Sequence, residues 1–279
     1  MSAYSPVAIE SDNNVIISGV LNFDLEQTFD CGQAFRWTKI SEVIWRGIAN
    51  NRIIDIGYEN ETIILYNTNL TEYESFWRNY LDIDRDYSKI IDTISSNEIL
   101  KDAANQNKGI RILKQDRWEA LCSFIISQNN NIPRIKGIIE RLCENFGQPL
   151  ESGYSFPTAE NIASLTVDDL ACIRSGFRAR YIIDGAKKYI NGDIDLEVIA
   201  TADIDTARNE LMKITGVGTK VADCTLLFGF NRIEALPKDV WIKRAITEYF
   251  HGEFPECALP YAGIAQQYLF NYIRNKTTV

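Results

Sequence analysis

Residues 215–224, TGVGTKVADC, place two glycines and a lysine directly before an apolar segment. Gly216 and Gly218 indicate a tight turn, because glycine adopts positive φ and lets the backbone approach a partner closely. Lys220 then falls at the start of the next helix, where the helix dipole and the apolar neighbours both favour the neutral amine. A neutral amine is a nucleophile. A GxG turn on its own, however, is most often only a corner between two helices.

A carboxylate follows this lysine in the segment LPKDVW at 236–241. Asp239 stands where the next helix should begin, so its structural interpretation is an N-cap. The helix leading away from Lys220 and the loop that returns would also bring this carboxylate near the amine. An amine and a carboxylate suit attack at a carbon that develops positive charge, such as an anomeric carbon. His251 is the only histidine, and we expect it at a surface or helix end, so acid–base chemistry falls to other side chains.

Composition limits the remaining chemistry. The six cysteines are scattered and form no CxxC pair, which argues against a zinc or iron–sulfur site. No run of about 18 apolar residues predicts a membrane span, and the first residues do not resemble a signal peptide, so we expect a cytoplasmic protein. The net charge of −9 argues against a nucleic-acid binder. Three basic groups, at 108–117, 134–141 and 177–181, nevertheless stand out from the acidic chain.

The elements that would position these residues differ along the chain. Up to about Asn67, apolar and polar residues alternate between turn signals, which predicts antiparallel strands. From Thr71 the period becomes helical, with a capping-box pattern formed by Thr71 and Glu74. We therefore expect an α+β protein with an antiparallel β-sheet domain and flanking helices at 1–105, followed by an all-helical domain at 106–279. With no long linker between them, a cleft between the two domains is the expected ligand site.

The combination of motifs is more specific than any single motif. The hairpin GVGTK and the segment LPKDV resemble the helix-hairpin-helix glycosylase superfamily of base excision repair. The segments DCGQAFRW (30–37), SFIISQNNNIPRI (123–135) and GIAQQYLF (263–270) resemble its 8-oxoguanine DNA glycosylase branch more closely. The resemblance extends from about residue 15 to the C-terminus. It implies a sheet like that of the TATA-binding protein, followed by a helix-hairpin-helix catalytic domain.

The resemblance implies a bifunctional enzyme that removes 8-oxoguanine from double-stranded DNA and then nicks the strand. Lys220 attacks C1′ and forms a Schiff base, β-elimination follows, and Asp239 stabilises the developing positive charge. The hairpin at Gly216 and Gly218 binds DNA phosphates through backbone amides. Family hairpins often hold a cation on turn carbonyls, here near Ile214 and Gly216. The resemblance further implies a monomer without a required cofactor, and the four-cysteine iron–sulfur loop of other branches is missing.

The flipped base would be bound by residues from distant segments. The carbonyl of Gly32 accepts the proton on N7, by which 8-oxoguanine differs from guanine. Cys224 and Phe270 match the two sides of the base sandwich, and Gln266 matches the residue that reads the Watson–Crick edge. Their structural alternatives are ordinary: Cys224 and Phe270 would be core residues, and Gln266 an exposed helix residue.

Four further residues match family positions that contact DNA. Asn129 fills the space left by the flipped base, although NNN also favours a helix C-cap. Arg134 and Arg178 match the pair that reads the orphaned cytosine. Phe177 occupies the wedge position, where a tyrosine is common, so an aromatic face remains but the hydroxyl is lost.

Two other functions fit the same motifs. One is a lysine-dependent glycosylase for another oxidised base, with a different pocket around Gly32, Cys224 and Phe270. The other is a non-catalytic helix-hairpin-helix module that only binds DNA. The presence of both Lys220 and Asp239 argues against the second, because backbone binding needs neither.

Overall fold

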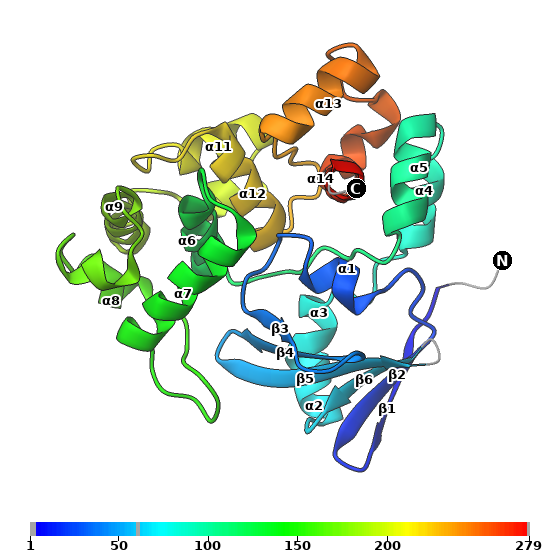
Figure 1. Cartoon of the computed structure of the whole chain (residues 1–279), viewed down its shortest axis with the longest axis horizontal. Helices are drawn as coiled ribbons and strands as arrows, with labels where there is room; N and C mark the ends of the chain where they lie inside the picture. The colour runs from blue at the N-terminus through cyan, green and yellow to red at the C-terminus, as the bar shows by residue number, and fades with distance from the viewer. Residues whose placement is uncertain (1–3, 60–61, 278–279) are drawn as a thin grey trace.

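A six-stranded antiparallel sheet lies at one end of the molecule and a helical assembly at the other (Figure 1). This computed structural model describes residues 4–59 and 62–277. The strand order is β1-β2-β6-β5-β4-β3. The strands are β1 (Val7–Ser11), β2 (Asn14–Ser18), β3 (Trp37–Lys39), β4 (Ile44–Ala49), β5 (Arg52–Glu59) and β6 (Thr62–Tyr66). The predicted antiparallel sheet, and its end near Asn67, are therefore confirmed.

The alternation read from the sequence places one face of each central strand in the core. Val15 and Ile17 on β2, and Ile63 and Leu65 on β6, are fully buried, while their neighbours are partly exposed. The predicted turn at Ala49–Asn51 is present, with positive φ at both asparagines. The second predicted turn includes residues 60 and 61, which lie outside the described part of the chain.

Six helical segments lie in the described part of the chain up to Asn107; the first four pack on the sheet, and the last two contribute to the helical core. They are α1 (Leu25–Phe29), α2 (Leu70–Glu72), the π-helix η1 (Tyr73–Trp77), α3 (Arg78–Tyr80), α4 (Tyr87–Ile94) and α5 (Glu98–Asn107). The capping box predicted at Thr71 is wrong. The N-cap lies two residues earlier: Asn69 has the extended backbone of an N-cap, and its side chain accepts a hydrogen bond from the Glu72 amide.

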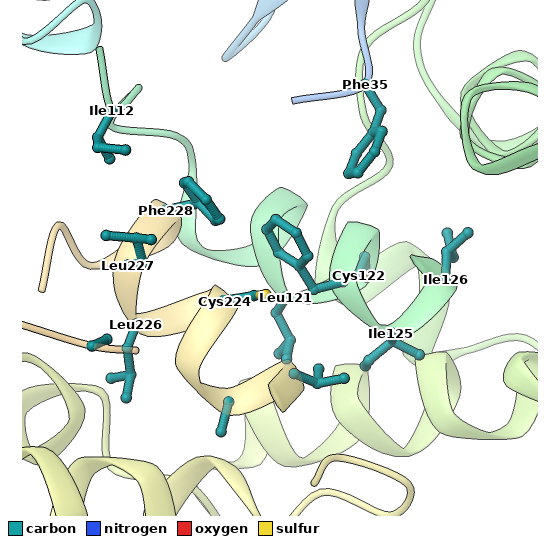
Figure 2. Packing of buried hydrophobic residues seen from close by; sticks show 14 of the residues in the cluster. Phe35, Ile112, Leu121, Cys122, Ile125, Ile126, Cys224, Leu226, Leu227 and Phe228 are labelled. Carbon is teal, nitrogen blue, oxygen red and sulfur yellow. The ribbon is translucent and has the colours of Figure 1, made fainter. Parts of the chain in front are cut away.

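The rest of the chain is helical, as predicted (Figure 1). The elements are α6 (Arg117–Ser127), α7 (Ile132–Phe146), α8 (Ala159–Ala163), the 3₁₀ helix η2 (Asp169–Ile173), α9 (Arg178–Asn191), α10 (Leu196–Thr201), α11 (Ile204–Leu211), α12 (Thr219–Gly229), α13 (Val240–Phe250), the 3₁₀ helix η3 (Glu256–Tyr261) and α14 (Ala262–Thr277). Helices α6 and α12 pack together at the centre, where Cys224 lies near Leu121 and Cys122 (Figure 2).

The connection between the two ends of the molecule depends on a buried arginine. Arg111 is fully buried, and its guanidinium donates to the carbonyls of Leu21, Asp82 and Arg85 while stacking on the ring of Tyr87. The basic group at 108–117 is therefore partly structural. The division of the chain at residue 105 stays a prediction. Helix α5 spans that position and its buried side chains belong to the helical core.

Candidate active site

A cleft of about 850 Å³ opens between the segment that follows α1 and the helices around the hairpin. It collects most of the residues that the sequence singled out, including Lys220 and Asp239. The predicted site residues that line it are Gly32, Asn129, Arg134, Gly218, Lys220, Asp239 and Phe270. A second cavity of about 70 Å³ shares several of these residues and adds Cys31, Cys224, Gln266 and Gln267. The sheet itself does not line the larger cleft: of the described residues before the predicted boundary at 105, only Gly32 and Phe35 do so.

The hairpin connects α11 to α12 through a turn in which the two glycines differ. Gly216 has a φ of +80°, and a Cβ there would lie 2.4 Å from the ring of Tyr181. Gly218 has an extended backbone (φ −101°) and is the N-cap of α12, with open space where a Cβ would stand. The expectation that both glycines take positive φ is therefore wrong for Gly218. Its missing side chain leaves the first amides of α12 accessible instead.

Helix α9 supports the hairpin through two charged side chains. A carboxylate oxygen of Asp184 accepts hydrogen bonds from the amide of Thr215 (2.7 Å) and from the ammonium of Lys188 (3.0 Å). The same ammonium donates to the carbonyl of Lys213 (2.5 Å). These bonds lower the pKa of Asp184 in spite of the opposing effect of its burial. The turn is therefore fixed on both of its sides before any ligand binds.

Lys220 lies in the cleft with few but specific contacts. Its Nζ donates to the hydroxyl of Ser127 (3.1 Å), which donates in turn to the carbonyl of Phe124 (2.8 Å). The ammonium also lies 5.5 Å from the centre of the Phe124 ring. Sequence reasoning missed Ser127 and Phe124. Both stand in a quoted motif, but nothing in that motif indicates which of its side chains turns toward a lysine much later in the chain.

Asp239 is both a helix N-cap and a neighbour of Lys220 in the cleft, as the sequence indicated. Its Oδ1 accepts a hydrogen bond from the Ile242 amide (2.8 Å), so it is the N-cap of α13. It also lines both cavities together with Lys220. One carboxylate oxygen is thus held by the helix, and the carboxylate lies in the cavity that contains the amine.

The smaller cavity has a buried polar atom that lacks a partner. Gln266 is 5% exposed, and its Oε1 accepts no hydrogen bond from any of the described residues. Such an atom is costly unless a ligand or water satisfies it. Phe270 and Cys224 line the same cavity. Burial raises the pKa of the Cys224 thiol to about 11, with the nearby charge of Lys220 acting in the opposite direction, so the thiol is neutral at physiological pH.

The four residues expected at the DNA strands are not equivalent. Asn129 is exposed just beyond α6 with a φ of +49°, Arg134 is exposed at the start of α7, and the ring of Phe177 is 51% exposed. Arg178 is only 3% exposed. Its Nε donates to the carbonyl of Gln128 (2.9 Å), and burial together with the charge of Arg134 lowers its pKa.

The carbonyl contacts of Arg178 hold the loop that carries Asn129. Besides the bond from Nε, the guanidinium donates to the carbonyls of Ser175 (3.1 Å) and Asn129 (3.4 Å). These bonds place Arg178 in a structural position, although it was predicted to read a base alongside Arg134.

Local charge in the cleft differs from the charge of the whole chain. Lys238 and Lys243, which sequence reasoning did not single out, are exposed on either side of Asp239 and line the cleft with Lys220 and Arg134. The cleft therefore gathers four basic side chains in a protein with a net charge of −9. This distribution answers the objection that an acidic protein should repel a polyanion.

No group of three or more His, Cys, Asp or Glu side chains that could hold a metal ion occurs among residues 4–59 and 62–277. The cysteines in this part of the chain are all free. None of the described helices is long and apolar enough to span a lipid bilayer.

Matches to known proteins extend over most of the chain. Residues 15–121 match the family described as 8-oxoguanine DNA glycosylase, N-terminal domain, and residues 122–253 match the HhH-GPD superfamily base excision DNA repair proteins. An N-glycosylase/DNA lyase of Saccharomyces cerevisiae is 30% identical over 254 residues, which cover 79% of this chain. The chain spans 66% of the length of that yeast relative.

Two solved structures are similar over nearly the whole molecule. MBOgg1, in complex with a low-affinity DNA ligand, is 40% identical with a TM-score of 0.91, and the match covers 98% of this chain and 99% of that one. An 8-oxoguanine glycosylase/lyase of Clostridium acetobutylicum, bound to double-stranded DNA with cytosine opposite 8-oxoG, is 36% identical with a TM-score of 0.91 and coverage of 97% and 98%. This chain therefore belongs to the 8-oxoguanine DNA glycosylase family of the HhH-GPD superfamily.

Proposed function

We propose that this protein excises 8-oxoguanine from duplex DNA through a Schiff base on Lys220 and then nicks the strand by β-elimination. The observation that carries the proposal is the cavity that contains Lys220, Asp239 and the unpartnered amide oxygen of Gln266. A nucleophile, a carboxylate and an unsatisfied base-reading group meet there. The structural similarity to a glycosylase/lyase bound to DNA containing 8-oxoG supports the same substrate.

The chemistry follows from an amine facing C1′ of a flipped nucleotide. In the reactive state Lys220 is a neutral amine. Its Nζ lone pair forms a bond to C1′ while the N-glycosidic bond breaks, and the departing base takes the bonding electrons and a proton from the alkylated nitrogen. Sugar-ring opening gives the protonated Schiff base, and loss of a C2′ proton then expels the 3′ phosphate. The carboxylate of Asp239 stabilises the positive charge that develops on the sugar, an effect worth several kcal/mol in a water-poor site.

The base is recognised from both faces and from its edge. We propose that the ring of Phe270 and the neutral thiol of Cys224 enclose the base. The Oε1 of Gln266 would accept a hydrogen bond from the N1–H or N2–H of the purine, which removes its unsatisfied state. The carbonyl of Gly32 would accept the N7 proton that distinguishes 8-oxoguanine from guanine.

The DNA backbone would be held at the hairpin and the opposite strand at the far rim of the cleft. The free amides at the start of α12, next to Gly218, would bind a phosphate, with the turn fixed by Gly216. We propose that Asn129 fills the space of the flipped base and that Phe177 wedges between the neighbouring bases.

Arg134 would then be the main reader of the unpaired cytosine. Its guanidinium is exposed on the rim of the cleft, whereas that of Arg178 is bonded to backbone carbonyls. Arg178 would contribute to the same recognition by holding the loop next to Arg134.

The two other functions are less well supported. A non-catalytic module would not need an amine and a carboxylate in one cavity. A glycosylase for an oxidised pyrimidine would not explain the extended match to the 8-oxoguanine branch, at the N-terminal family and in the structure with 36% identity.

Three accompanying features belong to the same proposal. We propose that the protein acts as a monomer in the cytoplasm, which light scattering and fractionation would test. We also propose a cation at the hairpin, with the Gly216 carbonyl as its main ligand. The Ile214 carbonyl already accepts a hydrogen bond from the Val217 amide (3.0 Å), and the Lys188 ammonium lies on the adjacent Lys213 carbonyl. Thermal unfolding with and without added potassium tests the cation site.

The deciding experiment is borohydride trapping on a duplex with 8-oxoguanine opposite cytosine. The wild-type protein should give a covalent adduct, because borohydride reduces a Schiff base to a stable amine. Lys220→Gln should give none while it retains most of the DNA affinity, since Arg134, Lys238 and Lys243 in the cleft are unchanged. An adduct formed by the variant at the wild-type rate would contradict the assignment of the nucleophile.

A further inference from the structure

Four consecutive backbone carbonyls, from Asp30 to Gln33, run past the base cavity, and side chains bind three of them. Both terminal nitrogens of Arg274 donate to the Asp30 carbonyl (3.1 Å each). The Nε2 of Gln267 donates to the Cys31 carbonyl (3.0 Å). The Nε2 of Gln115 donates to the Gln33 carbonyl (2.7 Å). In the part of the chain that the structure describes, the Gly32 carbonyl alone in this run accepts no hydrogen bond.

The side chain of Gln33 fixes the end of this segment. It is fully buried, and its Nε2 donates to the carbonyls of Thr28 and Arg111 (2.8 Å each). Its Oε1 accepts a hydrogen bond from the Leu113 amide (2.9 Å). Gly32 itself has a φ of +83°, which favours glycine. The orientation of its carbonyl is thus determined by its neighbours, because each adjacent peptide group is held at its own oxygen.

The donors on α14 share that helix with residues of the base cavity. Gln267 is 4% exposed and follows Gln266 directly, and Phe270 lies between Gln267 and Arg274 on the helix. One helix therefore carries an edge reader, a stacking ring and the two side chains that hold the opposite wall. A shift of α14 relative to the segment would change all of them together.

We infer that Gln267 and Arg274, assisted by Gln115, are positioning residues that determine lesion specificity, because they direct the Gly32 carbonyl toward N7 of the bound base. This inference rests on the proposed function. 8-Oxoguanine carries a hydrogen on N7, whereas guanine has a lone pair there. A carbonyl aimed at N7 attracts the first and repels the second, but only if its direction is fixed, since hydrogen bonds weaken steeply with angle. If these side-chain donors were removed, the Gly32 carbonyl could turn away from N7 of guanine. The preference for 8-oxoguanine over guanine would then fall.

The test compares discrimination with chemistry that involves no base. Gln267→Met keeps the length of the side chain and removes the donor. Arg274→Met and Arg274→Lys form a second pair, and Asn275→Ala, an exposed residue of the same helix, is the matched control. The first measurement is the ratio of affinities for duplexes with non-cleavable 2′-fluoro-8-oxoguanine and 2′-fluoroguanine opposite cytosine. The second is nicking of a preformed abasic site, which contains no base to read.

We expect Gln267→Met to lower the affinity ratio about tenfold, the effect of a misaligned hydrogen bond to a buried group, and to leave abasic-site nicking within about twofold of wild type. Arg274→Lys should lie closer to wild type than Arg274→Met, and Asn275→Ala should equal wild type. An unchanged ratio in both methionine variants would overturn the inference, as would a parallel loss of abasic-site nicking. Failure of the proposed function would look different, since the wild-type protein itself would then not prefer 8-oxoguanine.

Discussion

Asp239 is the N-cap of α13, and we propose a chemical role for the same side chain. Two substitutions separate the two roles. Asparagine caps helices as well as aspartate does, whereas alanine costs about 1 kcal/mol at an N-cap. Asp239→Asn should therefore keep the free energy of unfolding and lose two or more orders of magnitude in single-turnover excision, because only the charge is removed. Asp239→Ala should lose both. If the asparagine variant excises at the wild-type rate, Asp239 is only a cap of α13.

The two arginines predicted to read cytosine should respond differently to substitution. Arg134 is exposed in the cleft, so Arg134→Ala should bring the excision rates opposite cytosine and adenine closer together and leave stability unchanged. One lost base contact corresponds to roughly 1–3 kcal/mol.

Arg178→Ala should instead destabilise the fold by about 1–3 kcal/mol, since the carbonyls of Gln128 and Ser175 lose their donor. The measurements are single-turnover rates on duplexes that differ in the opposing base, together with urea unfolding. A fully stable Arg178→Ala variant with lost cytosine preference would restore the symmetric role implied by the resemblance.

Residue types in the motifs indicated which side chains meet in the cleft but not which residues hold them there. Lys220 and Asp239 could be expected to meet because a single helix and a loop separate them. The bond from Gln267 to the carbonyl of Cys31 joins residues at opposite ends of the chain. No periodicity encodes such a contact, because it depends on how α14 packs against a segment folded with the sheet.

The two glycines of the hairpin have different surroundings, so we expect alanine to have different effects at the two positions. Gly216→Ala should destabilise the protein by about 1–3 kcal/mol, because a side chain there needs positive φ and meets the ring of Tyr181. Gly218→Ala should fold normally, because its backbone is extended and its side is open. It should nevertheless weaken DNA binding several-fold, since a methyl group would stand between the amides of α12 and a phosphate.

Urea unfolding and fluorescence anisotropy with an abasic-site duplex would measure the two effects. Equal stability of both alanine variants would contradict the role assigned to Gly216. Patterns in the sequence correctly indicated this helix–turn–helix, yet they could not distinguish the glycines. That difference arises from Tyr181 on α9, which packs against one glycine and not the other.

For the whole molecule, a nearly buried contact between an arginine and a carboxyl group connects the sheet end to the helical end. The guanidinium of Arg36, next to β3, lies 3.5 Å from the carboxylate of Glu119 on α6, and both side chains are nearly buried. Burial raises the pKa of Glu119 from 4.5 to about 7, although the charge of Arg36 opposes this effect. The native state therefore holds a proton on Glu119 at pH values where the unfolded chain has released it.

The difference in the pKa of Glu119 between the folded and unfolded states makes the protein less stable as pH rises. The stabilisation from protonated Glu119 is fully present below pH 4.5 and is lost as pH rises through about 7. The free energy of unfolding of the wild type, relative to Glu119→Gln, should fall by about 1–3 kcal/mol across that window. Urea unfolding of both proteins at pH 5 and pH 8 measures it, and the difference cancels other titrating groups. Parallel pH dependences would show that Glu119 does not titrate there.

The net charge of −9 wrongly argued against a nucleic-acid binder, because a net charge does not say where in the molecule the charged side chains lie. Arg111, Arg178 and Lys188 bind the protein's own backbone, while Lys238 and Lys243 gather at the cleft. The sequence alone therefore predicted the fold class, and most of the site residues that it singled out line the cleft. It could not predict which basic side chains remain available for a ligand.

Helix α14 carries residues that line the proposed base cavity and, through Tyr268 and Leu269, forms a fully buried part of the core. A shorter chain that lacks α14 would lose both the cavity residues and these core residues. A translation product that stops before α14 would lack Gln266 and Phe270, but it would also lack a helix that packs against α5 and α13 in the helical core. We expect such a product not to fold stably and to be open to degradation, so that a reactive amine without its base-selecting residues would not accumulate.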